Sequence, residues 1–239
     1  LRMNNGVYSD IISFLKADIR GNINVINFIE NYTPVFLIKS EDSVIVKGRS
    51  DREWVYIVTK SKSRLKEMLK YLDDGDKNFA VIEDWMIPVI SEGKKIKWLL
   101  KTNRLILNSN MFTNNPLLDN LKESEAMYVF ENSEYKEYLT PGYVRDRITS
   151  GVSSVIRLGG KPAAWGMTHD DGAIGFLNVL PQFRGRGLGK NVSIDMIQKV
   201  IKSGKLPFVH IEEGNTKSMN LAQGLGFVKD KTINWMQIE

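Results

Sequence analysis

The segment from Asn178 to Lys190 combines glycine and basic residues in a pattern that can bind phosphate. It reads Asn-Val-Leu-Pro-Gln-Phe-Arg-Gly-Arg-Gly-Leu-Gly-Lys and connects an apolar stretch to a helical one. Its three glycines let a ligand approach the backbone closely. Unpaired N–H groups at the start of a helix bind anions, and the basic side chains add positive charge. We therefore expect a pyrophosphate site in this segment.

Two other phosphate-binding loops do not fit this segment. A Walker A loop needs glycine at the position of Arg184, five residues before Gly189. The dinucleotide fingerprint needs glycine at the position of Lys190. The segment is therefore neither a nucleoside triphosphate loop of the Walker type nor a dinucleotide loop.

The elements around this loop follow from the apolar periodicity and the turn residues of the second half of the chain. Hairpin signals occur at 159–162 and 170–172, where glycine stands beside lysine, proline or aspartate. The sequence predicts helices at 141–149, 187–202 and 215–223, and strands at 152–158, 163–168, 173–179, 208–211 and 227–236. The order is three strands, a helix, a strand, a helix and a last strand.

The first half predicts a mixture of helices and strands. Ile11, Ile12, Leu15 and Ile19 have near-helical spacing, and a second helical stretch lies around 25–29. Strands are expected at 35–38, 43–47, 54–59 and 79–82, and a helix capped by Ser61 precedes the last of these. Residues 109–120 are rich in Asn, Pro and Asp, so we expect a linker there. The predicted domains are 3–108 and 121–239.

Two motifs in the second half resemble signatures of the GNAT superfamily of N-acetyltransferases. The family loop pattern, Arg/Gln-x-x-Gly-x-Gly/Ala, is met by Arg184, Gly187 and Gly189. The segment Asn215 to Phe227 resembles the second signature, a helix that opens with asparagine and ends in Leu-Gly-Phe before the last strand. The two motifs together are more specific than either alone.

Within the superfamily, the chain looks most like the glycine N-acyltransferase branch over residues 152–227. The matching motifs are Pro-Ala-Ala-Trp-Gly-Met-Thr at 162–168, Leu-Pro-x-x-Arg-Gly-x-Gly-Leu at 180–188 and His-Ile-Glu-x-x-Asn at 210–215. The resemblance implies the α/β (α+β) GNAT fold, with a mixed, mostly antiparallel central sheet flanked by helices. It also implies that the smaller N-terminal α/β domain can be a degenerate GNAT-like copy, because residues 3–108 carry no CoA loop.

The resemblance implies an acyl-CoA co-substrate, acetyl-CoA first, whose pantetheine arm lies where strand 173–179 splays from strand 208–211. Backbone amides around 177–179 would stabilise the oxyanion, and the acyl group would pass directly to an amine without a protein nucleophile. The residues expected to bind the acyl-CoA are Leu177, Val179, Arg184, Gly185, Arg186, Gly187, Leu188, Gly189, Lys190, Asn215 and Ser218. Asn215 is also a preferred helix N-cap, and both roles can coexist.

The usual catalytic residues of such enzymes are missing. The strand before the loop carries no carboxylate, so Glu212 and His210 are the best candidates for the general base, followed by Asp170 and His169. Strand alternation lets Glu212 and His210 share one face. Ala222 stands where a tyrosine acid is common, so water or Ser218 would protonate the thiolate.

Composition excludes several functional classes. The chain has no cysteine, which removes disulfides, thiolate zinc sites and cysteine nucleophiles, and we expect no metal. No stretch approaches the roughly 18 apolar residues of a membrane span, and no signal core is present, so we expect a cytoplasmic protein without a membrane partner. The net charge of +5 is scattered, which argues against nucleic acid as a partner.

Several alternatives stay open at this stage. The acceptor can be a small amine or amino acid, a protein N-terminus or a lysine, and the protein can be a monomer or a homodimer. A non-catalytic acyl-CoA sensor is the alternative to an enzyme, because Ala222 and the carboxylate-free strand remove familiar catalytic groups. Trp54, Trp85, Trp98 and Trp165 lie in apolar segments and are expected to pack in the core rather than bind an acceptor.

Overall fold

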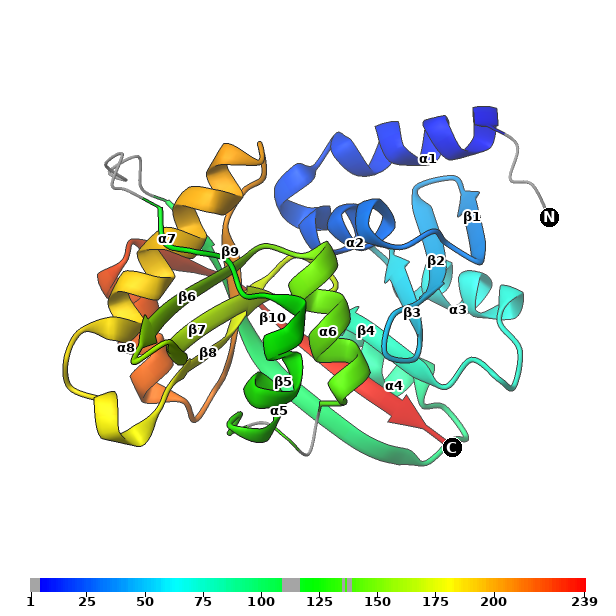
Figure 1. Ribbon diagram of the computed structural model, residues 1–239. Helices are drawn as coiled ribbons and strands as arrows, with labels where there is room; N and C mark the ends of the chain where they lie inside the picture. The colour runs from blue at the N-terminus through cyan, green and yellow to red at the C-terminus, as the bar shows by residue number, and fades with distance from the viewer. Residues whose placement is uncertain (1–4, 109–116, 135, 137–138) are drawn as a thin grey trace. The chain divides into compact units, whose positions relative to one another are not determined.

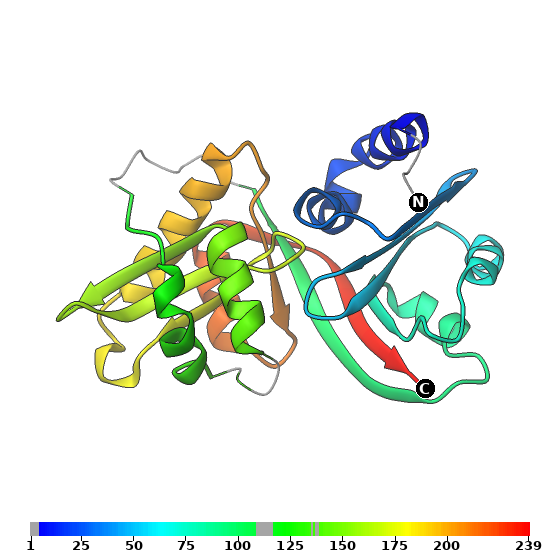
Figure 2. The ribbon, with the colours of Figure 1, turned by 45° about the vertical axis from the view of Figure 1, so that its right-hand side comes forward.

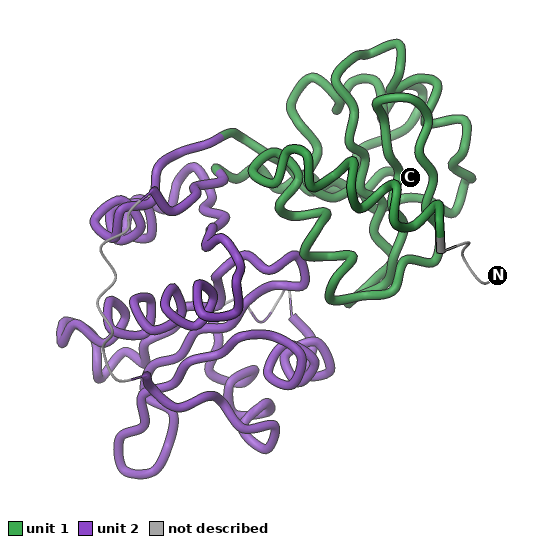
Figure 3. Tube along the Cα trace, turned by 90° about the horizontal axis from the view of Figure 1, so that it is seen from above, with its two compact units in different colours: residues 1–103, 231–239 green, residues 104–230 purple. Residues whose placement is uncertain are grey.

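The computed structural model describes residues 5–108, 117–134, 136 and 139–239. The chain divides into two compact units, shown in different colours in Figure 3. Unit 1 comprises residues up to 103 together with 231–239, and unit 2 comprises 104–230. Strands β5 (Ile96–Leu107) and β10 (Phe227–Ile238) each contribute residues to both units. The C-terminal end of the chain therefore belongs to the same unit as its beginning.

The domain boundaries predicted from the sequence, at 108 and 121, stay a prediction. Most of the predicted linker 109–120 lies outside the described residues, since these stop at 108 and resume at 117. Residues 117–120 are described and lie within unit 2, where the N–H of Leu118 donates to Asp195 and Lys199 donates to the side chain of Asn120.

Unit 1 is a sheet between two helical layers. Its elements are α1 (Asn5–Lys16), α2 (Ile19–Asn31), β1 (Phe36–Ser40), β2 (Ser43–Arg49), β3 (Glu53–Val58), α3 (Lys62–Met68), β4 (Asn78–Ile82) and α4 (Ile87–Ile90). Alternate residues of a strand point to opposite faces. Val44 and Val46 pack with α1 and α2, whereas Ile45 packs with α3 and α4. Each face of β2 thus has its own apolar core.

Unit 2 repeats this layered arrangement. Its elements are α5 (Ala126–Glu131), α6 (Pro141–Ser150), β6 (Ser153–Leu158), β7 (Lys161–Thr168), β8 (Ile174–Val179), α7 (Leu188–Lys202), β9 (Phe208–Glu212) and α8 (Thr216–Gly224). Figures 1 and 2 show α7 on one face of β6 to β8 and α6 on the other. Ala164 of β7 packs with α7, while Trp165 packs with α5 and α6. The mixed, mostly antiparallel sheet flanked by helices that the sequence predicted is confirmed.

The two units share an order of elements. Each has two helices, three consecutive antiparallel strands, a helix, a further strand and a second helix. In each, the strand after the first crossover helix runs parallel to the strand before it, through Val55 and Phe79 in unit 1 and through Ile174 and Val209 in unit 2. The connections before the crossover helices differ. Ser61 caps α3 by accepting from the Arg64 N–H, whereas α7 begins after the glycine-rich loop.

Local sequence signals placed most elements correctly, with one correction and with the omission of α4, α5 and β5. Ile19 does not continue the first helix, because α1 ends at Lys16 and Asp18 caps a new helix by accepting from the N–H of Gly21. Strand β5 was not predicted, although it is 12 residues long. Trp54 and Trp165 are buried, as expected for core residues. Within the described part of the chain, no helix has the length and apolarity needed to cross a membrane.

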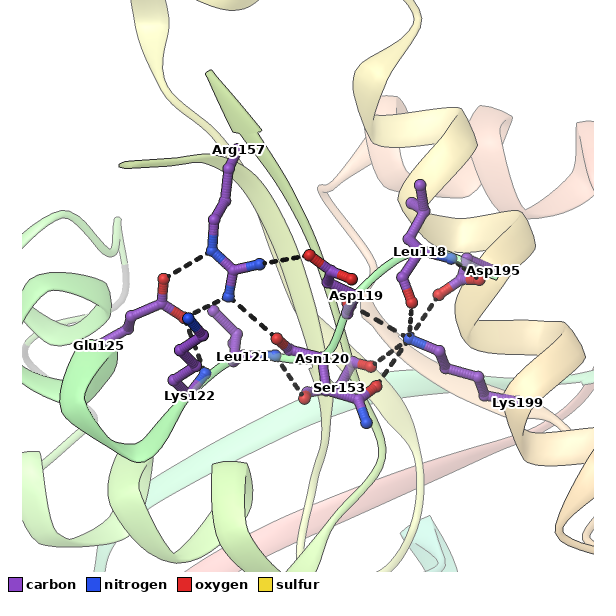
Figure 4. Close-up of polar contacts among 10 residues, drawn as sticks. All are labelled: Leu118, Asp119, Asn120, Leu121, Lys122, Glu125, Ser153, Arg157, Asp195 and Lys199. Carbon is purple, nitrogen blue, oxygen red and sulfur yellow. Dashed lines mark hydrogen bonds and ion pairs between the residues drawn. The ribbon is translucent and has the colours of Figure 1, made fainter. Parts of the chain in front are cut away.

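Two basic side chains hold residues 118–125 against the rest of unit 2. Lys199 donates to the carbonyl oxygens of Leu118 and Ser153 at 2.9 Å, and its Nζ lies 2.8 Å from Oδ2 of Asp195. Arg157 pairs with Glu125 at 2.8 Å. Figure 4 shows both cations surrounded by acceptors from the segment and its neighbours. This network joins residues 118–125 to β6 and to helix α7, whose other end carries the glycine-rich loop.

Candidate active site

The glycine-rich loop connects the end of β8 to the start of α7, where the sequence predicted a phosphate site. After Val179 the chain makes a short 3₁₀ turn at Pro181–Phe183 and then enters the loop. Gly185 and Gly187 have φ values of 76° and 75°, in the left-handed region that favours glycine. Gly187 is the N-cap of α7. The two glycines thus turn the chain from the strand into the helix.

The backbone of this loop is open to a ligand. A Cβ atom placed on Gly185 or Gly187 would meet no other atom within 4 Å. Gly189 differs, because its Cβ would lie 3.4 Å from the Val179 side chain, so the first turn of α7 packs closely on β8. The first N–H groups of a helix have no acceptor within the helix. They carry the positive end of the helix dipole.

The basic side chains of the loop do different things. The Nε atom of Arg184 donates to the carbonyl oxygen of Val179 at 2.9 Å, and its guanidinium pairs with Glu134. Arg186 lies over the ring of Phe183, 5.6 Å from its centroid, and both Arg186 and Lys190 are exposed. Arg184 therefore fixes the shape of the loop, while Arg186 and Lys190 leave their charges toward solvent.

Strand β8 contains a bulge just before the loop. Gly175 pairs with Met167 and Asn178 pairs with Trp165, so two residues of β8 lie opposite one residue of β7. Phe176, the first of the two, has a φ of 49°, which is uncommon for a residue with a side chain. The bulge alters the direction of the backbone N–H groups around Leu177, which are the expected oxyanion donors.

Strands β8 and β9 part after a short pairing, as the resemblance implied. They run parallel and pair at Ile174 and Val209, near the beginning of both strands. The bulge and the rest of β8 follow this pair. The opening between the two strands therefore widens toward the glycine-rich loop.

An aromatic group supports the bulge. The ring centroids of His169 and Phe176 lie 4.1 Å apart. The ring of Tyr143 contacts that of Phe176 edge to face, with 6.0 Å between the centroids. A Cβ atom on Gly175 would clash with the His169 ring, so the imidazole sits directly against the β8 backbone. Burial lowers the pKa of His169 to about 4, so the ring is neutral at neutral pH.

The two candidate bases differ in their surroundings. Glu212 is exposed at the end of β9. His210 has a side chain that is only 8% exposed, and its Nε2 lies 3.0 Å from Oδ2 of Asp171. The face shared by 208, 210 and 212 is opposite to that of Ile211, which packs in the core with α7. Asp171 was not among the predicted site residues, although its Asp-Asp-Gly turn signal placed it in a hairpin.

Asn215 and Ser218, two further predicted residues, lie at the start of α8. Asn215 is the N-cap, and its side chain accepts from the N–H of Ser218 at 3.0 Å, which confirms its capping role. Ala222 is buried and packs in the same core as Val192 and Phe227.

Among the described residues, no group of three or more acidic or histidine side chains could hold a metal ion.

Comparison with known proteins places this geometry in a structural class. Residues 155–236 match the model of the family described as FR47-like protein. No curated protein matches the sequence of this chain. A solved Drosophila protein is 15% identical and superposes with a TM-score of 0.79, covering 97% of this chain and 96% of its own.

Two further solved structures that are similar to this chain are GNAT proteins. A GCN5-related N-acetyltransferase from Kribbella flavida is 11% identical, with a TM-score of 0.58, and the match covers 90% of this chain and 93% of that one. A tandem GNAT protein from the clavulanic acid biosynthesis pathway is 12% identical, with a TM-score of 0.57, covering 99% and 96%. The chain has the GNAT fold. At these identities the GNAT likeness establishes the fold alone. The FR47-like match at 155–236 includes the glycine-rich loop.

Proposed function

We propose that this protein is an acyl-CoA-dependent N-acyltransferase, with acetyl-CoA as the first acyl donor to test. The observation that carries the proposal is the open backbone at Gly185 and Gly187, at the start of α7 and at the end of a bulged strand that parts from β9. Helix N-termini with accessible N–H groups bind phosphate oxygens. The loop therefore suits the pyrophosphate of a CoA ester, and the GNAT fold supports this assignment.

Different residues of the chain would bind the pyrophosphate and the pantetheine arm of the acyl-CoA. The N–H groups of Leu188, Gly189 and Lys190 would hold the pyrophosphate, and the exposed Arg186 and Lys190 would add charge. The parted strands would take the pantetheine arm along Leu177 and Val179. Asn215 and Ser218, at the start of α8, would contact the same ligand from the side of β9.

The chemistry needs a proton acceptor and an oxyanion donor. Bound acetyl-CoA supplies an activated thioester, so no protein nucleophile is required. We assign proton acceptance to Glu212, because its carboxylate is exposed at the end of β9. Backbone N–H groups at the β8 bulge would stabilise the negative charge that develops on the thioester oxygen. Ala222 offers no acid, so water or Ser218 would protonate the departing thiolate.

The acceptor that we propose is a primary amine in general. The motifs at 162–215 resemble glycine N-acyltransferases, but no comparison supports that branch, so glycine is not singled out. The test is a screen of amino acids, polyamines and peptides with acetyl-CoA, in which released thiol is measured. Turnover with one class supports the enzyme and names its acceptor. Tight acetyl-CoA binding without turnover across all classes would instead support a sensor.

Unit 1 is proposed to be a degenerate copy of unit 2. Both share the strand order and the parallel pair after the first crossover helix. In unit 1 the connection from β3 to α3 has no glycine, and Ser61 already fills the N-terminal position of α3. It follows that unit 1 should bind no acyl-CoA. Calorimetry should therefore give a stoichiometry of one acyl-CoA per protein chain.

A further inference from the structure

Asp171 and His210 connect the turn after β7 to strand β9, at the narrow end of the opening between β8 and β9. Oδ2 of Asp171 lies 3.0 Å from Nε2 of His210. His210 follows Val209, the residue that pairs with Ile174 where the two strands are still joined. The side-chain contact therefore reinforces the place from which the strands diverge.

The turn that carries Asp171 is itself held in place. Oδ1 of Asp171 accepts from the N–H of Ala173 at 3.1 Å, and Arg147 donates to the carbonyl oxygen of His169 at 3.2 Å. The N–H of Asp170 donates to the hydroxyl oxygen of Tyr143 at 3.3 Å. Asp171 is 1% exposed and Arg147 is 0% exposed. The carboxylate thus offers His210 a fixed anchor.

His210 is badly placed to take a proton from an acceptor amine. A general base must come within about 3 Å of the reacting group, or reach it through one water. The Nε2 atom of His210 faces Asp171, the Nδ1 atom is buried, and the ring contacts Phe208 at 5.4 Å. Glu212, two residues along the same strand, is exposed instead. The imidazole is built into the fold, whereas the carboxylate faces outward.

We propose that His210 and Asp171 are a positioning pair that sets the separation of β8 and β9 where the acyl end of the donor lies, and that His210 is not the proton acceptor. This inference rests on the proposed function. With the pyrophosphate at the loop after β8, the rest of the donor runs back along β8 toward Ile174 and reaches the narrow end of the opening. A displacement of about 1 Å at a reacting centre can cost about a hundredfold in rate.

The decisive comparison is between His210→Gln and His210→Ala. Glutamine keeps an N–H donor for Asp171 but cannot act as a base at neutral pH. A positioning role predicts that His210→Gln keeps kcat within about threefold of wild type, while His210→Ala loses about tenfold or more. Equal and large losses of kcat in both variants would mean that His210 takes the proton, and the positioning role would be overturned. Wild-type kcat in both variants would overturn it as well.

A binding measurement tests the same pair without turnover. Adenosine 3′,5′-bisphosphate lacks the pantetheine arm, so its affinity depends on the loop alone. The affinity for acetyl-CoA depends also on the opening between the strands. His210→Ala and Asp171→Ala should weaken acetyl-CoA binding while leaving the affinity for the bisphosphate unchanged. Unchanged affinity for both ligands would contradict the pair's role at the acyl end.

A matched control separates lost positioning from lost stability. Asp195 is also a buried, paired carboxylate of unit 2, but it contacts Lys199 on α7. Asp195→Ala should lower the melting temperature and leave both affinities unchanged. If the wild-type protein bound neither ligand, the proposed function would fail and this role with it, whereas ligand binding that is insensitive to His210→Ala would overturn the pair alone.

Discussion

The Nε atom of Arg184 lies 2.9 Å from the carbonyl oxygen of Val179, so the first basic residue of the loop is fastened to the strand that precedes it. The guanidinium also pairs with Glu134. A planar guanidinium can donate to several acceptors at fixed angles, which an ammonium group cannot do. Arg184 thus holds the loop in its conformation, which we call its framework role, and its positive charge contributes less to ligand binding.

Replacing Arg184 by lysine should weaken acetyl-CoA binding although the charge is kept. Lysine loses the fixed donor geometry toward Val179, and one hydrogen bond from a charged group is worth roughly 1.5 kcal/mol, or about tenfold in affinity. Arg186→Lys is the matched control, because Arg186 lies over the ring of Phe183 and does not carry the bond to Val179, so this change should alter the affinity by less than about threefold. Isothermal titration of both variants checks this, and equal affinities in the two would refute the framework role.

Replacing Glu212 by glutamine should abolish most turnover while leaving acetyl-CoA affinity nearly intact. The amide cannot accept the ammonium proton, and general-base catalysis contributes about a hundredfold or more in rate. Glu213→Gln removes a neighbouring exposed carboxylate and serves as the control. Full turnover in Glu212→Gln, measured by thiol release, would move the proton acceptor elsewhere.

The neutral imidazole of His169 should make the protein sensitive to mild acid. Its pKa is lowered to about 4, whereas a histidine in the unfolded chain has a pKa near 6.5. Above pH 6.5 both states are neutral and the effect vanishes. As the pH falls from 6.5 to 4, the unfolded chain binds a proton that the folded one does not, which costs up to about 3 kcal/mol.

Substitution of His169 by glutamine should remove that part of the acid sensitivity. As the pH falls from 7 to 4.5, the unfolding free energy of wild type should therefore decrease more than that of His169→Gln. Urea unfolding at a series of pH values measures it. If the two curves ran parallel over that interval, the lowered pKa would be wrong.

Lys199 should be among the most important charged residues for the stability of unit 2. Its side chain is 11% exposed and contacts Asp195 and three carbonyl oxygens, as Figure 4 shows. Removing one partner from a buried ion pair costs about 3 to 5 kcal/mol. Lys199→Met should therefore lower the unfolding free energy by about 3 kcal/mol, whereas Lys202→Met, at an exposed site on the same helix, should change it by less than about 0.5. Equal effects in urea would contradict the network's importance.

Local signals explain what the sequence predicted. Glycine at positions 185 and 187 is required by positive φ, and Asn215 caps a helix by a bond to a residue three positions away. Such features depend on a few neighbouring residues, so the loop and the start of α8 were predictable. The GNAT fold was implied by the resemblance of these two motifs to the family signatures.

Long-range contacts explain what the sequence did not predict. Arg104 is fully buried because it donates to Asp230, which is 126 residues away and belongs to another strand. Strand β5 lies between β10 and β9 in the sheet, so its partners are distant in the sequence and its charged and amide residues do not signal a strand locally. Asp171 and His210 are likewise 39 residues apart. Phe176 adopts a positive φ without being glycine, held by the His169 ring, and no local pattern signals such a bulge.

The measurement that tests the central claim most directly is the shift in melting temperature caused by acetyl-CoA in wild type, Gly187→Asp and Gly204→Asp. Gly187 and Gly204 both have a φ of 75° and open surroundings, and they flank the two ends of α7, so the substitutions impose similar backbone strain. Only Gly187→Asp puts a carboxylate beside the proposed pyrophosphate site. A ligand at about 100 times its dissociation constant stabilises the folded state by about 2.7 kcal/mol. We predict a clear shift in wild type and in Gly204→Asp and none in Gly187→Asp; an equal shift in all three proteins would show that acyl-CoA does not bind at this loop.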